Sequence, residues 1–157
     1  MWYRFAKRFE TSLIEDVSEK CADIAEEYWK ENVVGVTLIP NMYQHFAYKL
    51  TDELINSLKN HVNLNIHTAT TITSGTKNAE HQIRSYAMLA FRETSIRNYV
   101  KTSEMRINHK LSDQAELNHL LLGIREDVKE SILEIFRHIQ AETDVPEEER
   151  TFKLISG

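Results

Sequence analysis

The sequence predicts a mainly α-helical domain with a small β component, an α+β fold. Apolar residues recur every three to four positions through most of the chain, which is the period of a helix. The segment 62–73 instead alternates apolar and polar residues, which is the period of a strand. Only four glycines and two prolines interrupt these patterns, so we expect regular elements with tight connections. The length fits a single domain, 1–157, with 144–157 as a candidate C-terminal arm.

Amphipathic periodicity predicts four long helices, at 7–31, 42–60, 78–101 and 113–142. The last carries the strongest pattern, because its apolar residues repeat at spacings of three and four for about three heptads. Gly123 lies inside that helix. A glycine within a helix costs about 1 kcal/mol relative to alanine. We therefore expect another helix to approach closely at Gly123.

Strands are expected where β-branched or alternating residues occur. The segment 33–39 is rich in valine and is closed by Pro40, and 62–73 has the clearest alternation. The segment 103–110 alternates as well and leaves two readings open, a strand or a continuation of the preceding helix, with the strand favoured. The segment 151–156 is a candidate terminal strand, able to add to an open sheet edge.

Composition excludes some classes of protein and favours others. The chain is 41% apolar and 27% charged, as is usual for globular proteins. Its net charge of −5 favours neither nucleic acid nor an anionic membrane as a partner of the whole surface. No apolar run approaches the roughly 20 residues of a transmembrane helix. Cys21 is the sole cysteine and falls on the apolar face of the first helix, so we expect a buried thiol and a reducing, cytoplasmic setting.

Charge is unevenly distributed along the chain. The segment 77–110 contains seven basic residues against three acidic ones, whereas 113–150 contains eleven acidic residues against four basic ones. The favoured interpretation is that the basic segment meets an acidic helix, in the same chain or in a partner. The alternative is a phosphate- or nucleic-acid-binding surface. Its candidate residues are Thr76, Lys77, Arg84, Arg92, Arg97 and Lys101.

Motifs with defined chemistry are weak in this sequence. The turn predicted at 74–78 joins a strand to a helix, where backbone N–H groups and Lys77 would suit an anion, but it lacks the spacing of a phosphate-binding loop. None of the seven histidines belongs to a helical zinc-hydrolase motif. His67 and His81 flank the predicted turn and, with Thr76, would be the centre of a small hydrolase. We expect no catalytic residue, metal or cofactor, and the hydrolase ranks third.

The function that the sequence favours is a non-enzymatic assembly or interaction protein acting through its amphipathic helices. Its partner would be another protein or a second copy of the chain, and a component of a viral or phage complex would fit this description. A nucleic-acid- or phosphate-binding regulator is the second hypothesis. The expected interface residues lie on the last helix: Leu117, Leu121, Gly123, Ile124 and Val128.

Overall fold

The computed structural model describes residues 11–35, 41–69 and 73–143. They form four α-helices, α2 (Thr11–Trp29), α3 (Met42–Ala69), α4 (Thr73–Ile107) and α5 (Gln114–Thr143), and one π-helical turn, η1 (Lys30–Val34), which extends α2.

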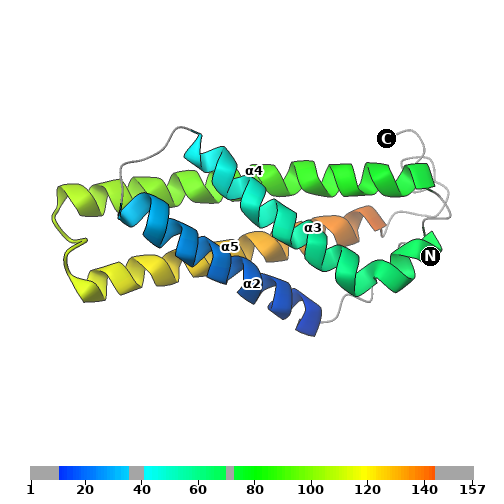
Figure 1. Cartoon of the computed structure of the whole chain (residues 1–157), viewed down its shortest axis with the longest axis horizontal. Coiled ribbons are helices and arrows are strands. Elements are labelled where there is room, and N and C mark those ends of the chain that lie inside the picture. The colour runs from blue at the N-terminus through cyan, green and yellow to red at the C-terminus, as the bar shows by residue number, and fades with distance from the viewer. Residues whose placement is uncertain (1–10, 36–40, 70–72, 144–157) are drawn as a thin grey trace.

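Successive helices run in opposite directions, and α2 and α3 lie across the long hairpin that α4 and α5 form (Figure 1). The packing closes a ring, since α2 contacts α3 and α5, and α4 contacts α3 and α5. This is an up-down-up-down four-helix bundle. Its two longest helices, α4 and α5, extend beyond α2 at the end where they are joined (Figure 1).

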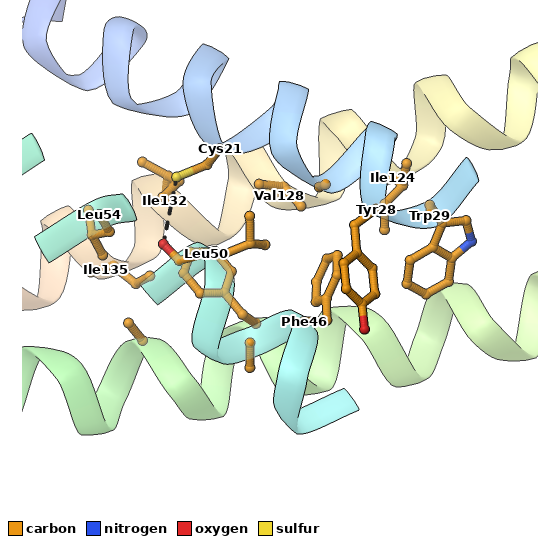
Figure 2. Packing of buried hydrophobic residues seen from close by; sticks show 14 of the residues in the cluster. Cys21, Tyr28, Trp29, Phe46, Leu50, Leu54, Ile124, Val128, Ile132 and Ile135 are labelled. Carbon is orange, nitrogen blue, oxygen red and sulfur yellow. Dashed lines mark hydrogen bonds between the residues drawn. The ribbon is translucent and has the colours of Figure 1, made fainter. Parts of the chain in front are cut away.

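The core lies between all four helices and is built from one apolar stripe of each (Figure 2). Phe46 of α3 packs edge-on against Tyr28 and Trp29 of α2, with ring centroids 5.6 and 5.5 Å apart. Such edge-to-face pairs add to the free energy gained by burying the rings. The last helix contributes a buried aliphatic row: Ile124, Val128, Ile132 and Ile135.

The α+β prediction is wrong, because the described residues contain no strand. Most of the clearest predicted strand, 62–73, is helical instead, because α3 runs to Ala69 and α4 begins at Thr73. Residues 70–72 lie outside the described residues. An isolated strand would have no partner in this bundle for its backbone groups. Extending an existing helix adds one hydrogen bond per residue fixed, which outweighs the small helix penalty of β-branched side chains.

The other predicted strands are also wrong where the structure describes them. In 33–39, Val33 and Val34 belong to the π-helical turn η1, and 36–39 lie outside the described residues. In 103–110, α4 continues to Ile107 and a turn follows. The candidate strand 151–156 and the candidate arm 144–157 also lie outside the described residues.

The helix predictions are more accurate. The helix expected at 113–142 is confirmed within one residue at each end by α5, and the one expected at 42–60 begins where α3 begins. The helix expected at 78–101 lies wholly within the longer α4. For the predicted 7–31, α2 and η1 cover 11–34, and 7–10 lie outside the described residues.

The connection between α4 and α5 is a tight turn at the tip of the hairpin. The amide of Lys110 donates to the carbonyl of Met105 at 2.8 Å, and the amide of His109 donates to the carbonyl of Arg106 at 3.2 Å. His109 has a φ of 56°. This is the Schellman pattern, in which glycine usually occupies the left-handed position. Asp113 then caps α5, because its Oδ1 accepts the amide of Ala115 at 2.9 Å.

Candidate functional site

The middle of α4 buries polar side chains and exposes apolar ones. Thr94, Ser95, Asn98 and Thr102 are each fully buried in the bundle, and all four carry polar side chains. Ile96 and Val100, which belong to the same stretch, are exposed on the opposite side of the helix. Surface helices normally show the reverse arrangement. This stretch is therefore inside-out relative to an ordinary bundle helix.

The buried polar groups of α4 are held by hydrogen bonds to α5 and α2. Thr94 and Ser131 join their hydroxyl oxygens at 2.8 Å, and Nδ2 of Asn98 donates to Oδ2 of Asp127 at 2.8 Å. Because buried polar groups cost free energy unless they are paired, these contacts explain how α4 tolerates a polar inner face. They also fix which face of α4 points inward.

The exposed apolar residues of α4 form one straight line, which we call the outer stripe: Leu89, Ile96, Val100 and Ile107. Their spacings of seven, four and seven residues place them within an arc of about 40° around the helix, over about 27 Å of its length. Their exposed fractions range from 38% to 75%. A row of exposed apolar residues along one face of a helix is a candidate surface for contact with another molecule.

Charged residues flank the outer stripe without covering it. Arg92 lies about 60° to one side of the stripe, whereas Glu93, Glu104 and Arg97 lie about 40°, 60° and 80° to the other. The two arginines are exposed, and neither makes an ion pair within the described part of the chain. Arg84 lies 3.7 Å from Asp52 of α3, and Lys101 lies 4.0 Å from Asp127 of α5. An apolar centre with a charged rim is the usual anatomy of a protein-binding surface.

The remaining candidates for anion binding and hydrolysis lie near the other end of α4. Thr76 and Lys77 belong to the first two turns of α4, so the turn predicted at 74–78 is wrong: the backbone is helical from Thr73. His67 lies in α3, and His81 is exposed on α4. Among the described residues, no group of three or more His, Cys, Asp or Glu side chains could hold a metal ion.

The residues expected to form a partner interface on α5 lie largely in the core of this chain. Ile124 and Val128 are fully buried, Leu121 is buried, and Leu117 packs against the same cluster. Gly123 is different, because a Cβ atom built on it would meet nothing within 4 Å. The close helix approach expected at Gly123 is therefore wrong: this glycine faces open space.

That open space belongs to a hollow of about 320 Å³ between α4 and α5, near the tip of the hairpin. Charged and ionisable side chains line much of the hollow: Lys101, Glu104, Lys110 and His119. The rest of the lining consists of the amide side chains of Asn98 and Asn108, the apolar side chains of Met105 and Leu120, and Gly123. Sequence analysis missed this site. Its residues come from two helices and a turn, and no spacing in the sequence connects Lys110 with His119.

An ion cluster joins α2 to α5 on another face. Arg125 donates to Asp23 at 2.7 Å, to Glu19 at 2.9 Å and to Glu26 at 3.2 Å. A hydrogen bond from Lys129 lowers the pKa of Glu19, and one from Lys30 lowers that of Glu26, with Arg125 contributing to both. The pKa of Arg125 is raised chiefly by its hydrogen bond to Asp23. The carboxylates of α2 are paired with the cations of this cluster, so we assign the cluster to the packing of α2 on α5.

Cys21 is a core residue, as expected. Its Sγ lies 3.9 Å from the carbonyl oxygen of Leu50 and is fully enclosed (Figure 2). Burial raises the pKa of the thiol to about 12. A thiol held protonated in this way is a poor nucleophile, and Cys21 therefore takes no part in a reactive site.

Comparison with known proteins gives no information on function, so the function is inferred from the geometry. The chain matches no protein family, no curated protein and no solved structure. Among the described helices, none has the length and apolar character needed to cross a membrane.

Proposed function

We propose that this protein is a binding module that docks an acidic amphipathic helix of a partner protein along the outer stripe of α4. The inside-out arrangement of α4 carries the proposal. Ile96 and Val100 are exposed to solvent while Asn98, between them, is fully buried. Covering the stripe with a partner's apolar face would remove this area from water at about 25 cal/mol per Å².

The chemistry of the partner is argued from charge. Arg92 and Arg97 flank the stripe and have no carboxylate of this chain as an ion-pair partner among the described residues. Carboxylates beside an apolar row on a partner helix would complement them. Charge complementarity at a rim sets specificity and the rate of association more than affinity. The partner helix therefore supplies apolar anchors and an acidic flank on the side of Arg92, whereas Glu93 and Glu104 lie beside Arg97 on the other side.

A second copy of the chain fits this surface less well. The stripe runs from Leu89 to Ile107, so its midpoint falls at Asn98. Two stripes paired in opposite directions about that midpoint would bring Arg97 of one copy close to Arg97 of the other. Like charges facing each other destabilise such a pair. The same central apolar row is poorly suited to nucleic acid, which requires cations along the line of contact.

The proposal is tested by fluorescence anisotropy with a labelled helical peptide that has leucine at core heptad positions and glutamate at the flanks. We expect binding to the native chain, and at least tenfold weaker binding for the double variant Ile96→Ser/Val100→Ser. Both side chains are exposed, so the fold should tolerate their loss. The matched control is Leu122→Ser, which removes a comparably exposed side chain from α5 and should leave binding unchanged.

Three outcomes would overturn the proposal. The first is equal binding of a peptide with lysine at the flanks, and the second is equal loss in the α5 control. The third is preferential binding of single-stranded DNA that weakens steeply with salt, as phosphate contacts do. Light scattering over a range of concentration tests self-association separately, and a dimer abolished by Ile96→Ser/Val100→Ser would assign the stripe to a second copy instead.

A further inference from the structure

The hollow at the tip of the α4–α5 hairpin has the chemistry of a ligand site. We propose that it binds a small organic phosphate between Lys101, Lys110 and His119. This site is separate from the docking of a helix on the outer stripe, and it stands whether or not that docking occurs.

Charge is the first argument for an anion. Two ammonium groups, of Lys101 and Lys110, and one imidazole, of His119, line the hollow against a single lining carboxylate, that of Glu104. The nearest carboxylate outside the lining, Asp127, lies 4.0 Å from Nζ of Lys101 and already accepts a hydrogen bond from Asn98. Within the lining the two ammonium groups outnumber the carboxylate, so the hollow favours an anion such as a phosphate monoester.

Gly123 is the second argument, because packing does not explain it. It lies within α5, where glycine is less favourable than alanine. A Cβ atom at this position would contact nothing within 4 Å, so the bundle itself has no need of a glycine. Gly123 does line the hollow, and a side chain there would project into open space. A long side chain at this position would therefore fill part of the hollow.

The size and remaining lining indicate a small ligand with an organic part. A hollow of about 320 Å³ is at the lower end of the range for ligand sites. Met105 and Leu120 provide apolar surface for a carbon skeleton. Asn98 also lines the hollow, and its buried Oδ1 has no hydrogen-bond partner in the described structure.

The test is titration calorimetry of the native chain with three probes, glycerol 3-phosphate, inorganic phosphate and succinate. We expect glycerol 3-phosphate to bind more tightly than inorganic phosphate, because it adds hydroxyl groups and a carbon skeleton, and succinate to bind more weakly than either. Gly123→Leu is the decisive variant. Its side chain fills the hollow and improves helix propensity. We therefore expect at least tenfold weaker binding together with an unchanged or raised melting temperature.

Lysine variants test the charge directly. Lys101→Gln and Lys110→Gln should each weaken binding several-fold, whereas Lys20→Gln, at an exposed position on α2, is the matched control and should not. The proposal fails if no probe binds with a dissociation constant below about 10 mM, or if Gly123→Leu binds as the native chain does. Succinate binding as tightly as glycerol 3-phosphate would reassign the hollow to dianions in general. None of these variants alters the outer stripe. A negative result for phosphate binding therefore leaves the proposal of helix docking untouched.

Discussion

Nε1 of Trp29 donates a hydrogen bond of 3.0 Å to Oγ1 of Thr102, and both residues are fully buried. The two positions are 73 residues apart in the sequence. Thr102 donates its own hydroxyl hydrogen to the carbonyl of Asn98 at 2.7 Å, so it links the end of α2 to the polar inner face of α4. A bulky indole placed in the core thus has its one polar atom satisfied by the inside-out segment of α4.

Replacing Thr102 with valine should destabilise the bundle. Thr102→Val keeps the shape of the side chain but leaves the indole N–H of Trp29 buried without a partner. We expect the free energy of unfolding to fall by about 1–3 kcal/mol, measured by urea denaturation. Thr102→Ser retains the hydroxyl group and should recover most of the hydrogen-bonding contribution. Equal destabilisation by valine and serine would show that the hydrogen bond contributes nothing measurable.

Arg125→Gln should destabilise the packing of α2 on α5 in a pH-dependent way. At pH 7 we expect a loss of about 1 kcal/mol, because Arg125 is largely shielded and contacts three carboxylates. The pKa values of Glu19 and Glu26 are lowered in the fold, so their stabilisation is present above about pH 4.5 and disappears as the pH falls through the folded-state values.

The measurement is the difference in unfolding free energy between native chain and variant from pH 7 to pH 3, and this difference should shrink on acidification. Arg137→Gln is the control. Arg137 pairs with Glu134 of its own helix and is well exposed, so its loss should have little effect at any pH. A difference that stays constant with pH would exclude the carboxylates as its source.

Cys21 should make stability fall at high pH. Its folded-state pKa is raised to about 12 from an ordinary value of 9.0. Since the raised pKa belongs to the folded state, the contribution is complete below about pH 9 and is lost as the pH rises toward 12, by about 1.4 kcal/mol per pH unit. Urea denaturation of the native chain and of Cys21→Ala should therefore converge above pH 9. Parallel pH profiles would show that the thiol ionises equally in both states.

The sequence was most informative where one face of a helix is apolar and buried. Along α5, the three-and-four spacing predicted one apolar face, and Ile124, Val128, Ile132 and Ile135 on that face are all fully buried, although Ile124 and Val128 were expected to bind a partner. Cys21 was placed correctly by the same argument. In both helices the hydrophobic effect and the helical period lead to the same orientation, so a single sequence is sufficient.

Alternation of apolar and polar residues was misleading, because a strand also needs a second strand to pair with, and alternation alone does not show that one is present. In 62–73 the β-branched residues fit a pleated face, but β propensity depends on pairing and burial that the sequence alone does not show. At 103–110, Met105 is half-buried whereas Ile107 is exposed, so residues two apart do not share an environment. The flanking helices instead extend into both regions, α3 to Ala69 and α4 to Ile107.

The outer stripe was missed for a different reason. The apolar residues of a helix are expected to face a core, and Ile96 and Val100 lie within the helix expected at 78–101. The structure turns Asn98 and Thr102 inward instead, because Asp127 and Trp29 are placed to pair with them. Those partners lie 29 and 73 residues away, so the orientation of α4 follows from tertiary contacts. A spacing of seven, four and seven in Leu89, Ile96, Val100 and Ile107 was the only local signal.

His109→Gly should stabilise the α4–α5 hairpin. His109 has a φ of 56°, a left-handed conformation that glycine adopts without steric cost and other residues adopt at about 1 kcal/mol. The histidine side chain is exposed, so its removal loses little packing. We expect the free energy of unfolding to rise by about 0.5–1 kcal/mol and the melting temperature by a few degrees. The matched control is His119→Gly. It places a glycine inside α5, where it should destabilise by a similar amount. A loss of stability in His109→Gly would instead show that the imidazole stabilises the turn.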